Sequence, residues 1–374
     1  MVEKQHRVLI VDDSKAMCQF LSSTMARDPS LLVVGCAHDP YEARELIKKT
    51  APDVITLDIE MPKMDGITFL RNLMRLKPMP VVMLSSLTAA GAGPTLEALK
   101  IGAVDFMVKR HPAGDREILE YMNEICRITK SAAQVNVSQP SERKGASGKA
   151  KPEFAEWKAK AARGGTAATG IKKLITIGAS TGGPEALRNV LEHTYSPDCA
   201  VTVCQHMPTR FMGPFAERLN QFSRYNIALA EDGEIIKPGH GYVAPGDYHL
   251  EVVRQGSNLV CKLRSGERVN GHMPSVDVMY QSAASLLGPS SLGVLLTGMG
   301  NDGAAGLKAM RDSGSLCIVQ DERSSAVWGM PGSAVALDGA DAILPLQDIG
   351  PSLDDLLNEA KTPGRKISEI AQRA

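Results

Sequence analysis

Short apolar runs alternate with amphipathic segments along the first 130 residues. The runs are rich in Val, Ile and Leu, which is typical of parallel strands buried on both faces of a sheet. The predicted strands cover residues 6–13, 31–37, 54–58, 80–86 and 105–109. The predicted helices cover residues 15–27, 41–50, 67–76 and 115–130, and Ser14 is placed to cap the first of them. Strands that alternate with helices predict a sheet wound on both faces.

The hydrophobic periodicity stops after residue 130 and returns near residue 171. Residues 131–170 are rich in Ser, Ala, Gly, Lys and Gln, which predicts an interdomain linker. Phe154 and Trp157 are the exception, because two aromatics three residues apart could anchor a short helix. We therefore divide the chain into a first domain, a linker, a second domain and a C-terminal tail. Their predicted ranges are 1–130, 131–170, 171–350 and 351–374.

The second domain again contains buried strands, and each is followed by polar residues. The strands are predicted at residues 174–177, 200–204 and 291–297. Residues 178–183 are small, and Pro184 opens a plausible helix. The chain is therefore expected to hold two α/β domains, each a doubly wound parallel sheet.

In the first domain, acidic residues stand where strands end. Asp12, Asp13 and Asp58 are expected at the carboxyl edge of the sheet, where sites form in doubly wound folds. Three close carboxylates repel one another and require a hard cation such as Mg²⁺. Ser85 and Lys109 end strands at the same edge and could bind a phosphoryl group carried by a carboxylate. Any one of these acids alone could instead be a helix cap or a solvated loop residue.

In the second domain, Ser180 lies in the glycine-rich turn between a strand and a helix. The segment Gly-Ala-Ser-Thr-Gly fits the short Gly-x-Ser-x-Gly pattern of nucleophilic serines, which also occurs by chance. Three interpretations stay open on this stretch alone: a nucleophile, a phosphate-binding loop, or a plain tight turn. The Gly-x-Gly-x-x-Gly and Walker patterns are absent from the stretch, which weakens the nucleotide interpretation.

Two further residues complete a possible triad. His206 and Asp302 each follow the end of an apolar strand, so they can converge with Ser180 at one sheet edge. A serine needs a base to take its proton, and a carboxylate holds that base in the correct tautomer. The chain order Ser, His, Asp differs from that of α/β-hydrolases, which predicts a different fold. Asp302 could also cap the helix that begins near residue 304.

Composition narrows the function classes. Lys plus Arg and Asp plus Glu number 42 each, so no overall charge attracts nucleic acid or a membrane surface. The seven cysteines form no Cys-x-x-Cys pair, which favours reduced thiols and a cytoplasmic protein. We expect neither a signal peptide nor a membrane-inserted segment.

Residues 5–130 resemble the receiver domain of response regulators, a flavodoxin-like fold. The family's functional positions fall on Asp12 and Asp13 (acid pair), Asp58 (phosphoacceptor), Ser85 (switch hydroxyl), Phe106 (switch aromatic) and Lys109. The family usually has proline directly after the lysine, whereas here Arg110 and His111 intervene. The resemblance implies Mg²⁺ in the acidic pocket and a chemotaxis histidine kinase as phosphodonor.

Residues 172–348 resemble the Rossmann-like catalytic domain of chemotaxis protein-glutamate methylesterases. The stretches that carry this resemblance begin at Gly178, Gln205, Gly241, Pro274, Leu296 and Trp328. The family's catalytic residues fall on Ser180, His206 and Asp302, and its positions beside the nucleophile and oxyanion fall on Thr181 and Met299. One difference is Met273, where the family often has arginine before Pro-Ser-Val-Asp, so substrate contacts are expected to differ there.

The resemblance implies a cytoplasmic hydrolase that releases methanol from γ-glutamyl methyl esters of chemotaxis receptors, needs no cofactor for this step, and is regulated by its receiver. Some members also deamidate receptor glutamines. One alternative is a receiver-controlled serine esterase or amidase that acts on another signalling protein. A second alternative, a transcription regulator, would have a short basic helix-turn-helix output, whereas this output is long, strand-rich and not basic.

Overall fold

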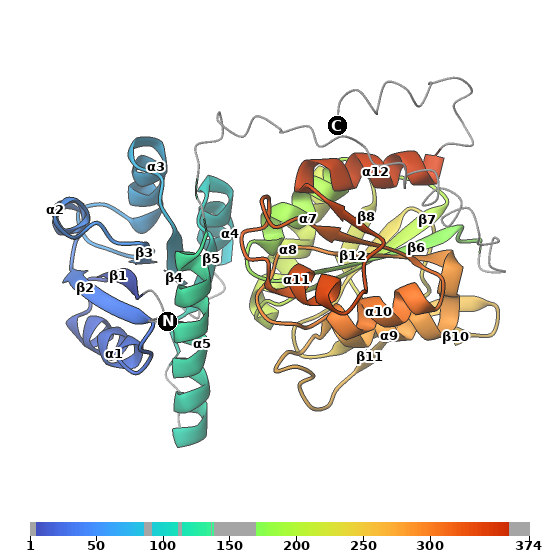
Figure 1. Ribbon diagram of the computed structural model, residues 1–374, viewed down its shortest axis with the longest axis horizontal. Helices are drawn as coiled ribbons and strands as arrows, with labels where there is room; N and C mark the ends of the chain where they lie inside the picture. Colours follow the sequence, from blue (N-terminus) through green and yellow to red (C-terminus); the bar gives the residue numbers. More distant parts are fainter. Residues whose placement is uncertain (1–4, 86–91, 111–113, 136, 138–169, 359–374) are drawn as a thin grey trace. The chain divides into compact units, whose positions relative to one another are not determined.

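The computed structural model describes residues 5–85, 92–110, 114–135, 137 and 170–358, and it divides into two compact units. The units are Met1–Lys144 and Gly145–Ala374, and each is built around one parallel sheet (Figure 1). The predicted fold class of two doubly wound α/β domains is therefore confirmed. Phe154 and Trp157 of the predicted linker lie outside the described residues.

The first unit holds a five-stranded sheet in the order β2-β1-β3-β4-β5, with every neighbouring pair parallel. Its strands are β1 (His6–Val11), β2 (Leu31–Ala37), β3 (Val54–Asp58), β4 (Val81–Ser85) and β5 (Asp105–Val108). Its helices are α1 (Lys15–Met25), α2 (Pro40–Thr50), α3 (Gly66–Leu76), α4 (Ala92–Ile101) and α5 (Asp115–Ala133). The central strand β3 is buried along its whole length, as its apolar run predicts.

Helices α1 and α5 pack together against the sheet of the first unit. Leu21 of α1 and Ile125 of α5 are fully buried in the core beneath them. The predicted cap of α1 is confirmed, because the amide of Met17 donates to the Ser14 hydroxyl at 3.3 Å. Helix α5 extends to Ala133, so the predicted start of the linker at residue 131 falls within its last turn.

The second unit holds a seven-stranded sheet in the order β14-β13-β12-β6-β7-β9-β8, again parallel throughout. Its strands are β6 (Lys173–Ala179), β7 (Cys199–Gln205), β8 (Asn226–Leu229), β9 (His240–Val243), β12 (Ser291–Leu295), β13 (Leu316–Gln320) and β14 (Ala342–Leu344). Its helices are α7 (Gly183–Glu192), α8 (Thr209–Phe222), α9 (Val276–Leu287), α10 (Ala304–Asp312), α11 (Gly329–Ala336) and α12 (Leu346–Asn358), and the short 3₁₀ turn η2 (Gly288–Ser290) follows α9.

Helices cover both faces of this sheet: Figure 1 shows α7 and α12 on one side and α9 and α10 on the other. A separate antiparallel hairpin, β10 (His249–Gln255) with β11 (Asn258–Arg264), packs on α9 and was not predicted. Strand β12 ends two residues before its predicted end, because the amide of Thr297 donates to the Gln320 side chain at 2.8 Å. Helix α12 crosses residue 351, where the tail was predicted to begin.

The three central strands of the second unit, β12, β6 and β7, are direct neighbours. The carboxyl end of β6 pairs with both others, Gly178 with Leu295 and Ala179 with Gln205. Residues that follow these three strands must therefore meet at one edge. Within the described ranges, no helix is long and apolar enough to cross a bilayer.

Candidate active site and acidic pocket

Ser180 occupies the predicted turn between strand and helix. Strand β6 ends at Ala179, and α7 begins at Gly183 with Pro184 in its first turn. The Ser180 amide donates to the Thr297 carbonyl at 3.0 Å, and its carbonyl accepts from the Gln205 side chain at 2.9 Å. Both neighbouring strands therefore hold the backbone of the candidate nucleophile.

Two glycines give this turn its shape. Gly182 has a φ of 76°, in the left-handed region that favours glycine. At Gly298, an added Cβ would lie 2.8 Å from the Cβ of Ser180, so only glycine lets the loop after β12 approach the turn. The small residues that the sequence shows around Ser180 therefore serve a close approach of two backbones.

His206 and Asp302 form a buried hydrogen-bonded pair at the same edge. Nε2 of His206 lies 2.8 Å from Oδ2 of Asp302, and their side chains are 8% and 1% exposed. The amide of His206 donates to Ala179, the residue before Ser180, at 3.2 Å. The predicted convergence of the three strand ends thus brings His206 onto Asp302, with Ser180 beside them on the neighbouring strand.

The pairing also defines which nitrogen of His206 can act as a base. An ionised carboxylate only accepts hydrogen bonds, so Nε2 carries the proton and Nδ1 of the neutral ring bears the lone pair. Nδ1 is buried and has no hydrogen-bond partner in the part of the chain that the structure describes. The basic atom of His206 is therefore available to a hydroxyl.

Asp302 accepts an unusual number of hydrogen bonds for a buried carboxylate. Besides His206, its donors are the side chains of Asn270 (3.0 Å) and Ser275 (2.7 Å) and the amides of Val276 (2.7 Å) and Asp277 (3.2 Å). The two amides belong to the first turn of α9, so the carboxylate caps this helix as well as holding the histidine. The sequence suggested a capping role on α10, whereas the side chain caps α9.

Helix α10 is capped by the neighbouring acid instead. Asp277, in the first turn of α9, accepts from the Gly306 amide of α10 at 2.6 Å. Its other oxygen accepts from Asn270 at 2.7 Å, so one amide side chain bridges both carboxylates. Asp302, two residues before α10, therefore caps α9, and Asp277, in α9, caps α10.

These contacts set the charge of Asp302. Burial by itself raises the pKa of this carboxyl, but the hydrogen bond and charge of His206, with the donors Asn270 and Ser275, outweigh burial and hold the pKa well below its usual range. Burial raises the pKa of Asp277, and the nearby charge of Asp302 adds to the shift. Asp302 is thus the acid that stays ionised.

The other histidines of the second unit have different environments. His249 is fully buried, and its ring bonds the Glu267 carbonyl and accepts from the amide of Ser275. Rings of His193 and His240 bond nearby backbone carbonyls at 2.8 and 3.0 Å. His272 stacks directly on His206, with ring centroids 3.7 Å apart and planes 3° apart.

Thr181 and Met299 flank Ser180. Thr181 follows it directly and is buried, and its carbonyl accepts from the Thr297 hydroxyl at 2.9 Å. Met299 follows Gly298, the residue that touches the Ser180 turn, and is half-buried. The Trp328 motif supports this loop, because the amide of Met330 donates to Gly298 at 2.8 Å.

Sequence reasoning assigned no role to several residues that hold the site. Gln205 and Ser275 lie in stretches that carry the resemblance to methylesterases, but their individual roles were not predicted from the sequence. No link from Asn270 to Asp302 or from His272 to His206 was predicted either. The available signal was Asn270-Gly271, a dipeptide typical of two-residue hairpin turns, five residues before Ser275. Met273 is half-buried in the segment between that turn and Ser275.

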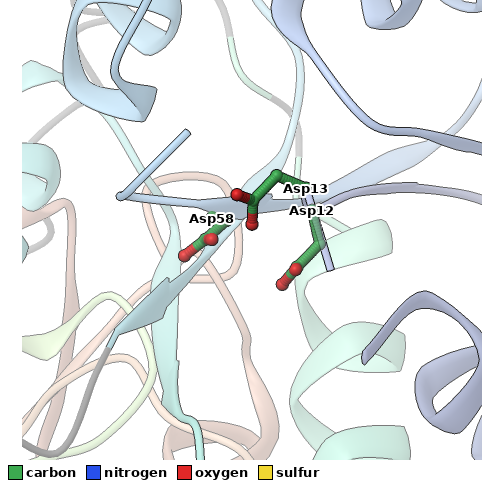
Figure 2. A group of neighbouring side chains, drawn as sticks. All are labelled: Asp12, Asp13 and Asp58. Carbon is green, nitrogen blue, oxygen red and sulfur yellow. The ribbon is translucent and has the colours of Figure 1, made fainter. Parts of the chain in front are cut away.

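In the first unit, the three predicted acids do come together. Figure 2 shows Asp12 and Asp13, directly after β1, beside Asp58 at the end of β3. One carboxylate oxygen from each lies within 4.8 Å of the others, an arrangement that could hold a metal ion. Lys109 bonds Asp12 at 2.8 Å and Asp58 at 2.7 Å through its ammonium group.

Asp58 has a different electrostatic balance from Asp302. Burial raises the pKa of the Asp58 carboxyl to about 6, and the charge of Asp12 adds to this, against the opposing effect of Lys109. A single lysine therefore does not compensate the clustered acids. Additional positive charge among these acids would lower the pKa of Asp58 again, which fits a divalent cation in this pocket.

The two predicted switch residues lie on β4 and β5, neighbouring strands of the same sheet. Ser85 ends β4 and is fully buried, and its hydroxyl accepts from Thr95 of α4 at 2.7 Å. Phe106 of β5 is 6% exposed, so its ring points into the protein. Pro112 comes three positions after Lys109 in this sequence, and residues 111–113 lie outside the described residues.

The two units together describe a response regulator whose output domain carries the side chains of a serine hydrolase. The family model for the response regulator receiver domain matches residues 8–123, and the model for CheB methylesterase matches residues 175–353. The chain belongs to the family of protein-glutamate methylesterases that carry a receiver domain, which confirms the resemblance inferred from the sequence.

Relatives match nearly the whole chain. A protein-glutamate methylesterase/protein-glutamine glutaminase from Xanthomonas campestris is 47% identical, over 96% of this chain and 99% of its own length. One from Pseudomonas aeruginosa is 45% identical, over 92% and 95%. The crystal structure of the Thermotoga maritima CheB methylesterase catalytic domain is 36% identical, covers 49% of this chain and 98% of its own, and aligns with a TM-score of 0.48.

Proposed function

We propose that this protein is a phosphorylation-controlled serine hydrolase that removes methyl groups from glutamate γ-methyl esters of chemotaxis receptors and deamidates receptor glutamines. The names of its relatives support the two reactions. The observation that carries the chemistry is the His206–Asp302 pair, buried beside Ser180 with Nδ1 of the histidine available.

In the proposed mechanism, Nδ1 of His206 takes the proton of the Ser180 hydroxyl as its oxygen attacks the ester carbonyl. The ionised Asp302 holds the proton on Nε2 and stabilises the imidazolium. The oxyanion forms beside the backbone at Thr181 and Met299. Methanol leaves with the proton from His206, and water then releases the glutamate and restores the serine. For a glutamine side chain, ammonia leaves in place of methanol.

The receiver is proposed to control this reaction from residues 1–130, joined by the linker 131–170 to the catalytic domain 171–350 and the tail 351–374. Asp12, Asp13 and Asp58 would hold Mg²⁺, which neutralises the acids and the incoming phosphoryl group when bound. Asp58 would accept the phosphoryl group from a chemotaxis histidine kinase in the cytoplasm. Lys109 and Ser85 would then contact the phosphoryl oxygens, with Phe106 as the switch aromatic.

The test is release of methanol from receptors that carry labelled methyl esters. The full chain should release labelled methanol in proportion to ester lost, and a parallel assay should detect ammonia from receptors with glutamine at the same positions. The alternative, an esterase or amidase for a different signalling protein, predicts no methanol from receptors although small acyl esters are cleaved. A receptor preparation with its glutamates unmethylated is the matched control.

A further inference from the structure

The turn from Val269 to His272 reaches both the acid and the base of the proposed triad. The amides of Val269 and His272 each donate to the other's carbonyl, at 3.0 and 2.9 Å, which closes a two-residue loop. Asn270 and Gly271 within the loop have φ values of 52° and 79°, as a type I′ turn requires. The backbone of this turn is therefore fixed by local geometry.

Asn270 directs its amide onto the acid. Its nitrogen bonds Asp302 at 3.0 Å and Asp277 at 2.7 Å. Burial raises the pKa of the Asp277 carboxyl, and repulsion from the Asp302 charge adds to this shift. A neutral donor shared between them holds the Asp302 oxygens in place without adding a charge that would compete with His206.

His272 places its ring flat against the base. The hydrogen bond from Nε2 to Asp302 holds one end of the His206 ring, but it leaves rotation about this bond possible. The parallel ring of His272, with its centroid 3.7 Å away, fills the space that such a rotation would require. The hydrogen bond and the stacked ring together fix the orientation of the His206 ring, so Nδ1 points in one direction.

We propose that the Val269–His272 turn is a positioning element for the triad, with Asn270 fixing the acid and His272 fixing the plane of the base. This inference rests on the proposed function, because it assigns a task to residues that act through His206 and Asp302. A displacement of about 1 Å at a reacting group can lower a rate by about 100-fold, so fixing these rings matters for catalysis.

The first experiment separates ring stacking from every other property of His272. His272→Ala removes the stacking ring and should lower kcat by about 10- to 100-fold with KM within about twofold. His272→Phe keeps a flat ring at this position and should recover kcat to within about threefold of wild type. His240→Ala changes a histidine outside the site and should leave kcat unchanged.

The second experiment separates the Asn270 side chain from the turn. Glycine tolerates the backbone of a type I′ turn, so Asn270→Gly removes the amide alone and should lower kcat by about tenfold. Asn270→Asp keeps the shape but places a third carboxylate beside two others, and it should lower kcat further. In an Asp302→Ala background, Asn270→Gly should not lower kcat further, because the acid through which Asn270 acts on His206 is gone.

Folding is checked by the thermal unfolding temperature of each variant. The proposal is overturned if folded His272→Ala keeps kcat within about twofold of wild type, or if His272→Phe is as impaired as His272→Ala with a raised KM. The second result would make His272 a substrate contact. Failure of the proposed function has a different signature, since Ser180→Ala would then retain hydrolysis.

Discussion

Asp302 and Asp58 are both buried carboxylates at the carboxyl edge of a parallel sheet, yet they carry opposite electrostatic balances. Asp302 accepts from one imidazole, two side chains and two amides of α9, and its pKa is held below its usual range. Asp58 has one lysine and two neighbouring acids, and its pKa is raised to about 6. The same edge of a parallel sheet can thus hold a carboxylate whose charge is stabilised by the protein and one whose charge is disfavoured by burial.

The difference shows how the position of donors decides the task of an acid. Around Asp302 five donors of the protein hold the pKa low, so the charge is permanent and can support a histidine throughout a catalytic cycle. Around Asp58, burial and the charge of Asp12 raise the pKa despite Lys109, so the charge state of this carboxyl responds to what binds in the pocket. A permanent charge suits catalysis, and a dependent one suits a switch.

The largest expected effect on the rate of hydrolysis concerns Ser180 and His206, the residues that act together with Asp302. Ser180→Ala and His206→Ala should each lower ester hydrolysis by about 10⁶-fold, and the double variant should be scarcely slower, because the residues act as a unit. Both are measured as methanol release from methylated receptor. His240→Ala is the control. Residual activity above about a tenth of wild type in Ser180→Ala would require another nucleophile.

The next largest effect is expected from removing the charge of Asp302. Asp302→Asn should lower kcat by about 10⁴-fold, because an amide neither holds the proton on Nε2 nor stabilises the imidazolium. It should also lower the unfolding temperature of the second unit by several degrees, since the cap of α9 loses its charge. Ser180→Ala should leave that temperature unchanged. Equal stability of the two variants would contradict the capping role of Asp302.

A smaller effect on the rate is expected from removing the charge of Asp58. Asp58→Asn should keep the basal rate of methanol release within about twofold, while a small phosphodonor that accelerates the wild type by about tenfold should leave the variant unchanged. The comparison needs only two proteins with and without phosphodonor and Mg²⁺. A basal collapse in Asp58→Asn would show that the acid supports the fold or catalysis directly.

The smallest effect concerns pH and metal. Because the folded pKa of Asp58 is about 6 and its ordinary value is 3.8, the folded state favours the protonated acid. In a chelator, the stability of the first unit should therefore fall as pH rises from about 4 to 6, by up to about 3 kcal/mol. Mg²⁺ should restore it at neutral pH. Asp58→Asn should remove most of this pH dependence, as followed by denaturant unfolding.

The sequence predicted both sheets and the residues at their edges, because buried parallel strands leave a plain apolar pattern and sites follow strand ends. Asp12, Asp13, Asp58 and Lys109 come together as expected, and so do His206 and Asp302. Each of these residues ends a predicted strand or follows one within five residues. Local pattern and global topology agree at these positions.

Contacts from other parts of the chain could not be predicted in this way. Asn270 reaches Asp302 across 32 positions of sequence, and the stacking of His272 on His206 depends on the orientation of a turn that belongs to neither strand. The hairpin β10–β11 lies off the main sheet, so strand alternation gives no sign of it. These features arise from packing between segments, which periodicity along one segment does not record.

The exchanged caps of α9 and α10 have a consequence for how this enzyme can change over generations. A substitution at Asp302 or Asp277 removes the cap of a helix end, so selection for folding would discard it before any new chemistry could be tried. The Ser180 side chain has no such duty, since backbone atoms make the contacts that hold its turn. Evolution is therefore freer to replace the nucleophile than the acid, and descendants with altered reactivity should retain both aspartates.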